Sequence, residues 1–275
     1  MKETQRIAPR ILVPTDFSTA SERAFFCALA LTVARQARLT MLHTGRENRD
    51  AIPWEQFPGI RDTLTQWQRL PAGAPRTAVA ETLNVGVAKM GMRESDPRRG
   101  IAEYLRRHPA DLLVMATAGR RGLARRLLGP SVAETVCHVT RTHSLMLPKR
   151  GPDLIDPATG RGSLKRILYV VAPQRDPRAD LVFIGRWLPP LSDGGLRVAL
   201  LQPEDADDSA TYGLPQIPGL QWGWERSEGE GSAAIIAAAK ATGAELVVLP
   251  TRLRSRDTEE ILHALRLPLL VIPAF

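Results

Sequence analysis

The segment between Met115 and Ser131 contains residue types that commonly bind phosphate groups. Gly119 and Gly129 would let the backbone come close to a ligand, and Gly129 directly precedes a run that is typical of a helix. A helix N-terminus offers unpaired N–H groups and a partial positive charge, which together attract an anion. Four arginines strengthen that attraction: Arg120, Arg121, Arg125 and Arg126. Phosphate recognition is therefore the first chemistry that the sequence indicates.

Asp16 is the second candidate group. It follows the apolar run 10–13, which predicts a buried strand, and it stands in the turn-rich segment 14–18. Ligands of open parallel sheets bind beyond the carboxyl ends of the strands, where the strand order reverses, so Asp16 and the 115–131 segment could share one site. Other interpretations remain open. Asp16 could cap the next helix, Pro130 suits the first turn of a helix, and the four arginines could form a solvated face.

Strands and helices alternate along the first half of the chain. This alternation predicts a parallel, doubly wound, Rossmann-like sheet of the α/β class. Ser18 or Thr19 is expected to cap the first helix, and residues 45–58 are expected to form a polar surface loop. The predicted strands are 10–13, 39–43, 85–92, 111–116 and 144–147, and the predicted helices are 18–37, 60–70, 75–84, 96–108 and 130–140.

The pattern restarts after the Pro/Gly-rich stretch 148–163, which we interpret as a linker. The run 165–170 echoes 10–13, and the run 244–249 echoes 110–115. Each half also closes with a short apolar strand before a proline, at Pro148 and Pro273. Three landmarks in the same order predict two tandem domains, residues 1–150 and 163–275.

The composition restricts the class of protein. Residues 1–150 hold 24 Lys and Arg against 13 Asp and Glu, a net charge of +11, whereas residues 151–275 have a net charge of −3. This asymmetry indicates an anionic partner for the first half, attraction between the halves, or solvated faces only. Cys27 and Cys137 lie in helical apolar patterns typical of buried thiols, so we expect a cytoplasmic protein. The longest apolar stretch, 24–34, is shorter than the about 20 residues that span a bilayer, so no membrane partner is expected.

Taken together, several segments resemble the universal stress protein family. They are the 14–18 turn, His43 and Thr44 at the end of the second strand, and the runs 111–123, 129–134 and 145–148. The resemblance covers residues 10–148 strongly and 165–273 weakly. It implies two domains of the adenine-nucleotide alpha hydrolase-like kind, each a five-stranded, mainly parallel sheet flanked by helices. In part of the family such a domain binds ATP, which would come with Mg²⁺.

The family's binding motif is Gly, two residues, Gly, nine residues, Gly, then Ser or Thr. Gly119 and Gly129 match the second and third glycines, but Ala116 stands at the first position. Pro130 stands at the Ser/Thr position, with Ser131 one residue later. Ala116 adds a methyl group where the backbone would approach the nucleotide, and Pro130 lacks an N–H. A charge-assisted hydrogen bond of that kind contributes about 1.5–3 kcal/mol, so Ser131 or the arginines would have to compensate.

The resemblance also assigns roles to other residues. Asp16 would meet the ribose or adenine, Thr44 and Met115 would line the base pocket, and Ser131 would reach phosphate. His43, at a strand end, is interpreted as a packing histidine. The complete candidate binding set is Asp16, Thr44, Met115, Ala116, Gly119, Arg120, Gly129 and Ser131.

The second half departs further from the motif. Ala172 stands where Asp16 stands in the first half, and Pro250 and Leu253 replace Ala116 and Gly119. We therefore expect no nucleotide there and a structural role. The resemblance implies antiparallel pairing of 144–147 with 269–272, an intramolecular pseudo-dimer that would cover both edges, and two chains could associate further as a homodimer.

These features predict a stress-response regulatory protein whose first domain binds ATP or a related nucleotide. No Gly-Lys-Ser/Thr phosphate loop, Ser/His/Asp signature or paired metal ligands occur in the sequence, so we do not expect an enzyme. The alternative is a nucleotide-free module that binds protein partners the sequence does not identify. Nucleic-acid binding is disfavoured, because the arginine cluster has no neighbouring aromatics and no helix-turn-helix signal is present.

Overall fold

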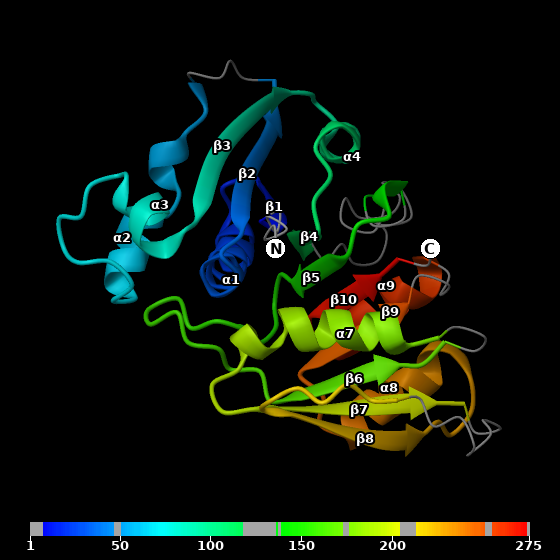
Figure 1. Ribbon diagram of the computed structural model, residues 1–275. Coiled ribbons are helices and arrows are strands. Elements are labelled where there is room, and N and C mark those ends of the chain that lie inside the picture. The colour runs from blue at the N-terminus through cyan, green and yellow to red at the C-terminus, as the bar shows by residue number, and fades with distance from the viewer. Residues whose placement is uncertain are drawn as a thin grey trace, which may run out of the picture.

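The computed structural model describes residues 8–46, 51–117, 136, 139–172, 176–203, 213–250 and 255–273 (Figure 1). The first half contains β1 (Arg10–Thr15), α1 (Thr19–Arg35), β2 (Arg38–Gly45), the 3₁₀ helix η2 (Trp54–Gln56), α2 (Ile60–Gln66), α3 (Ala78–Leu83), β3 (Gly86–Arg93), α4 (Pro97–Arg107), β4 (Leu112–Thr117) and β5 (Ser144–Pro148). The second half contains β6 (Arg166–Val170), α7 (Arg178–Trp187), η3 (Pro189–Leu191), β7 (Leu196–Gln202), β8 (Leu220–Arg226), α8 (Gly231–Ala241), β9 (Leu246–Pro250), α9 (Ser255–Leu265) and β10 (Leu269–Ile272).

Among the described residues, ten strands form one sheet in the order β3-β2-β1-β4-β5-β10-β9-β6-β7-β8. All neighbours within each half are parallel. In the first half β1 pairs with β2 on one side and with β4 on the other, so the strand order reverses at β1. The predicted fold class, two doubly wound sheets of five strands, is confirmed.

The two halves meet at an antiparallel pair of strands. Leu145 of β5 lies opposite Leu270 of β10, and Met146 lies opposite Leu269. The pairing of 144–147 with 269–272 that was expected from the sequence is therefore confirmed. It covers what would otherwise be two exposed apolar strand edges and makes the sheet continuous from β3 to β8.

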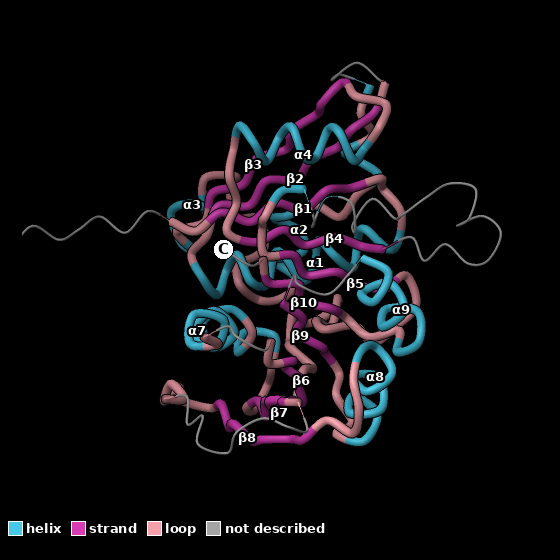
Figure 2. Tube along the Cα trace, turned by 90° about the vertical axis from the view of Figure 1, so that its right-hand side faces the viewer, coloured by secondary structure: helices cyan, strands magenta, loops and turns pink. Residues whose placement is uncertain are grey.

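Helices cover both faces of this sheet. Figure 2 shows the strands stacked between α7 on one side and α8 and α9 on the other. We call these sides the α1 face, which α1 and α7 cover, and the α4 face, which α4, α8 and α9 cover. Each face has one core cluster that continues across both halves. Met41 packs toward the α1 face and Leu42 toward the α4 face, and both are buried. Burial on both faces explains why the strands are continuous apolar runs.

The same hydrogen bonds align strands one and four in each half. The Asp111 N–H donates to the Arg10 carbonyl (2.9 Å), and the Arg10 N–H donates to Asp111 Oδ2 (2.8 Å). In the second half the Glu245 N–H donates to the Arg166 carbonyl (2.9 Å), and the Arg166 N–H donates to Glu245 Oε2 (3.3 Å). A backbone contact with an acidic side chain thus explains why an arginine and an acid recur at equivalent positions of the sequence.

The segment 148–163, which we interpreted from its composition as a linker, is packed against the first half. Leu154 and Ile155 are buried in the α1-face core, and the Trp67 Nε1–H donates to the Pro157 carbonyl (2.9 Å). The Trp67 ring lies where a Cβ on Gly160 would be, and Gly160 has a φ of +69°. The abundance of Pro and Gly here therefore reflects close backbone packing rather than a free spacer.

Two local predictions in the first half were wrong. Residues 45–58 were expected to be a polar surface loop, but Ile52 and Phe57 are buried and 54–56 form η2. The helix expected over 60–70 ends at Gln66, because the chain turns through Gln68, which has a φ of +58°. In both places packing against the α1-face core overrides the local pattern.

Candidate functional site

The turn that follows β1 has a strained backbone. Phe17 has a φ of +61°, which is uncommon for a residue with a bulky side chain. Its N–H donates to Thr15 Oγ1 (3.0 Å), and its ring lies 4.8 Å from the His43 ring and 5.4 Å from the Trp54 ring. These contacts hold the turn in place. The strained conformation is of the kind that clusters at binding sites.

This turn presents Asp16 to solvent beyond the carboxyl end of β1. Asp16 Oδ1 accepts hydrogen bonds from the Ser18 N–H (3.1 Å) and the Ser18 hydroxyl (2.6 Å). Burial raises the pKa of Asp16, but the hydrogen bonds from Ser18 and the Ser21 hydroxyl outweigh it, so the pKa lies below its ordinary value. Asp16 is therefore an anion at neutral pH.

Asp16 does not itself cap the following helix. Ser18 is the N-cap of α1, because its Oγ accepts a hydrogen bond from the Ser21 N–H (3.3 Å). Ser18 was one of the two caps predicted from the sequence, and Asp16 fixes the orientation of the capping hydroxyl. The interpretation of Asp16 as the cap of this helix is therefore wrong, although Asp16 does bind the residue that caps it.

Thr44 and Met115 both face the α4 side of the sheet. A Cβ on Gly100 of α4 would lie 2.7 Å from Thr44 Cγ2, so Thr44 packs directly against that helix. Met115 is 4% exposed and belongs to the α4-face core. The structure thus places these two residues on one face, at or near the carboxyl ends of strands on either side of β1.

Ala116 faces the opposite way. Its methyl group packs against the α1-face core. β1 pairs with β4 at Ile11–Leu112 and Leu12–Leu113, which lie before the carboxyl ends of both strands. The remaining candidates lie outside the described residues: Gly119, Arg120, Gly129 and Ser131.

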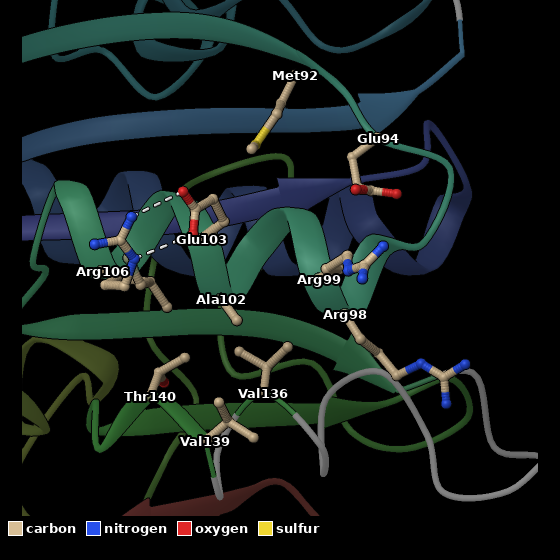
Figure 3. Close-up of a pocket in the computed structure, with 11 residues that line it drawn as sticks. Met92, Glu94, Arg98, Arg99, Ala102, Glu103, Arg106, Val136, Val139 and Thr140 are labelled. Atoms are coloured by element: carbon tan, nitrogen blue, oxygen red, sulfur yellow. Dashed lines mark hydrogen bonds and ion pairs between the residues drawn. The ribbon is translucent and has the colours of Figure 1, made fainter.

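A groove that sequence reasoning missed lies beside α4. It has a volume of about 680 Å³ and lies between α4 and the side chains of Val136, Val139 and Thr140. Figure 3 shows Ala102 on the side of α4 that faces Val136 and Val139. Val139 is 64% exposed although it is a large apolar residue. The only available signal was the helical spacing of Ile101 and Leu105, whose side chains are buried beneath α4.

Charged side chains border this groove. Glu103 accepts hydrogen bonds from Arg106 Nε (3.1 Å) and NH2 (2.9 Å), and Arg107 lies 2.6 Å away. The hydrogen bond from Arg106 is the main reason that the pKa of Glu103 lies below its ordinary value. At the other end of α4, Arg98 pairs with Asp96 (3.2 Å). The groove therefore combines an apolar floor with a rim of arginines and carboxylates.

His43 has the packing role that the sequence indicated. Its Nδ1–H donates to the Thr15 carbonyl (2.9 Å), since a carbonyl can only accept, and its ring contacts Phe17. Within the described ranges, no three His, Cys, Asp or Glu side chains gather as a metal site would require. No helix in those ranges has the length and apolar character needed to cross a membrane.

Comparisons with known proteins agree with this architecture. The sequence model of the universal stress protein family matches residues 8–147. The fold is similar to that of a universal stress protein from Archaeoglobus fulgidus DSM 4304, with a TM-score of 0.60, 17% identity and coverage of 96% of both chains. It is also similar to PA1789, a functionally unknown protein from Pseudomonas aeruginosa PAO1, with a TM-score of 0.56 and 15% identity over 97% of this chain and 92% of that one. No curated protein sequence gave a significant match. At these identities the structural likeness shows the fold, including both halves.

Proposed function

This chain belongs to the universal stress protein family, and on that premise we propose that it is a stress-response regulatory protein whose first half binds ATP or a related nucleotide. The carrying observation is Asp16, an exposed carboxylate with a lowered pKa beyond the carboxyl end of β1. The strand order reverses at β1, and doubly wound sheets bind ligands at such a point. A carboxylate there can accept hydrogen bonds from ribose hydroxyls or from an adenine amino group.

Two further candidates lie near the same carboxyl edge of the sheet as Asp16. Thr44 and Met115 supply a polar and a polarisable apolar side chain on the α4 face. Ala116 directs its methyl group into the α1-face core, so this methyl group does not crowd the α4 face. The resemblance assigns the phosphates to the segment from Gly119 to Ser131, and Mg²⁺ would be held largely by the phosphate oxygens.

We propose a binding role rather than catalysis. A general base works best when its pKa is near the operating pH. Hydrogen bonds from Ser18 lower the pKa of Asp16, so its carboxylate has little tendency to take a proton from water or substrate at neutral pH. This supports a site that senses a nucleotide. Cys27, whose pKa burial raises to about 12, is an inert thiol that suits a cytoplasmic protein.

Calorimetric titration with ATP and Mg²⁺ tests the proposal. We expect one site per chain and an affinity at least about tenfold weaker in Asp16→Asn, because a hydrogen bond to a charged group contributes about 1.5–3 kcal/mol. Asparagine can still accept from Ser18, so the turn is kept. Gly119→Val should also abolish binding, and Glu81→Gln on α3 is the matched control at an exposed acid. Absence of heat at millimolar ATP would refute a nucleotide role, and equal affinities for Asp16→Asn and Glu81→Gln would refute the role of Asp16 in binding.

The groove beside α4 supports the alternative, a nucleotide-free module that binds other proteins. Val139 exposes apolar surface next to a charged rim, as interaction sites do. In that case ATP gives no heat, and a photo-crosslinking residue at position 139 yields a discrete adduct in cells. The same residue at Val182, which is 56% exposed on α7, is the matched control and should yield none.

A further inference from the structure

A second pocket lies at the amino ends of β6, β7 and β8. It has a volume of about 500 Å³, and all its lining residues are in the second half, on the edge of the sheet opposite to the carboxyl ends of those strands. Lys165, Arg166 and Arg197 line it together with the turn 193–195 and Gly219. We propose that this pocket binds a small phosphate-bearing anion. The proposal does not depend on nucleotide binding in the first half.

Glycines create the space in this pocket. Arg38 pairs with Gly86 in the first half, and Arg197 pairs with Gln221 at the equivalent place in the second half. Gly195 and Gly219 each lie two residues before a member of the second pair. Their counterparts in the first half lie two residues before the members of the first pair. Those counterparts are Gln36 and Asn84.

In both halves these positions have a positive φ. The values are +49° and +52° at Gln36 and Asn84, and +109° and +76° at Gly195 and Gly219. In the first half the Asn84 Nδ2–H donates to Gln36 Oε1 (3.5 Å), so two side chains occupy this place. In the second half a Cβ on Gly219 would meet nothing within 4 Å. Loss of two side chains therefore opens a pocket where the first half is filled.

The charges that border the pocket are mostly positive. Arg166 and Arg197 lie directly opposite one another on adjacent strands, a like-charge arrangement that is destabilising by itself. Glu245 compensates Arg166, with Oε1 3.0 Å from NH2, and Arg166 Nε–H also donates to the Gly243 carbonyl (2.6 Å). Within the described part of the chain, the Arg197 guanidinium has no such partner.

Two further charged side chains line the pocket. Lys165 Nζ also has no partner among the described residues. Asp193 contributes a carboxylate to the lining, and Arg161 NH1 lies 3.9 Å from it. The pocket thus retains two uncompensated cations, Lys165 and Arg197. An anion bound beside Arg197 would offset the repulsion that Arg197 experiences from Arg166.

The chemistry of these groups favours a phosphate group. The planar fork of Arg197 matches two phosphate oxygens, and the Lys165 ammonium adds a point charge. Gly194 and Gly219 carry no side chain, and nothing lies within 4 Å of a Cβ built on either, so a ligand can approach the main chain. The volume is ample for a phosphate or pyrophosphate.

Titration of the full chain with inorganic pyrophosphate tests the proposal. Arg197→Gln removes one cation, and Gly219→Asn fills the pocket without changing any charge. Asparagine suits this position, because Asn84 adopts the same backbone conformation in the first half. We expect each variant to bind pyrophosphate at least about tenfold more weakly. The matched control is Arg38→Gln, the first-half equivalent of Arg197, which should bind as the native chain does. Absent binding at millimolar pyrophosphate, or variants that bind as tightly as the native chain, would overturn the proposal.

A second arm identifies the source of the phosphate. ADP is titrated into Asp16→Asn, with and without Gly219→Asn, so that the contribution of the first-half site is reduced. ADP binding tighter than pyrophosphate, and lost in Gly219→Asn, shows a phosphate carried on a nucleoside, whereas equal affinities show the free anion. ADP binding that Gly219→Asn leaves unchanged, together with absent pyrophosphate binding, overturns the proposal. Failure of the first-half site instead appears as ATP binding that Asp16→Asn does not weaken.

Discussion

Replacing Arg23 by methionine should destabilise the packing of residues 148–153 on the first half. Arg23 lies on α1, and its guanidinium binds a segment about 130 residues away in sequence. Its Nε–H donates to the Asp153 carboxylate. The other nitrogens donate to four backbone carbonyls, those of Pro148 (2.9 Å), Lys149 (3.2 Å), Gly151 (2.8 Å) and Pro152 (2.9 Å).

The expected loss is about 2 kcal/mol. A hydrogen bond to a charged group contributes about 1.5–3 kcal/mol, but water can replace the donor at carbonyls that are exposed. Of the four backbone contacts, only the one to Pro148 is partly buried, so the full contribution applies to that bond and the others add little. The ion pair is half-exposed at Asp153, and such pairs contribute about 0–1 kcal/mol.

Urea unfolding followed by tryptophan emission and by circular dichroism measures this loss. We expect Arg23→Met to lower the free energy of unfolding by about 2 kcal/mol and Asp153→Asn by less than about 1 kcal/mol. Arg23→Lys should fall between them, because an ammonium keeps the charge but cannot reach several carbonyls at once. Equal losses for Arg23→Met and Asp153→Asn would show that the ion pair alone matters and would refute the carbonyl argument.

Three further outcomes are expected. Tyr169→Phe removes the hydroxyl that donates to Oδ2 of the buried Asp180 (2.9 Å), so it should lower the free energy of unfolding by about 1.5–3 kcal/mol, and a loss below about 0.5 kcal/mol in chemical denaturation would contradict this. Gly100→Ala favours the helix by about 1 kcal/mol but places a methyl group 2.7 Å from Thr44 Cγ2, so we expect the free energy of unfolding to fall by about 1–2 kcal/mol. Thr44→Ser removes the contacting methyl group and should partly reverse this loss. A Gly100→Ala variant more stable than the native chain would disprove the contact. Because the pKa of Asp16 is lowered, its ionised carboxylate stabilises the fold above the ordinary pKa of 3.8, and this contribution is lost as the pH falls through the folded-state pKa. The difference in stability between the native chain and Asp16→Asn should therefore shrink on acidification. Carbon-detected NMR titration measures the pKa directly, and a value above 3.8 would contradict the hydrogen-bond argument.

The two halves share one framework. Helices α4 and α8 both begin fifteen residues before the next strand, and Ile101 and Ile235 occupy equivalent buried positions. In the second half α8 packs against α9, and the Ser232 hydroxyl donates to Glu260 Oε2 (2.8 Å). In the first half, Val136 and Val139 lie across the groove from α4.

Local patterns were sufficient to predict most of the framework. Ser18 begins α1 and Asp96 begins α4, whose first residue is Pro97, because N-caps and N-terminal prolines act on neighbouring backbone groups. Apolar β-branched runs predicted the buried strands, and three landmarks that recur in the same order predicted their repetition. Asp16 was also found this way, since a polar residue that follows a buried strand must lie at the sheet's carboxyl edge.

The amino-acid sequence by itself thus determined the order of the elements, the repetition of the fold and the position of Asp16. Only the tertiary structure decided which distant groups meet. Arg23 binding to the 148–153 segment, Thr44 against Gly100, and the pocket left by Gly195 and Gly219 each join residues far apart in the chain. Such contacts leave no periodic signal, because a side chain's partner across a sheet or a helix is set by the packing of whole elements rather than by its sequence neighbours.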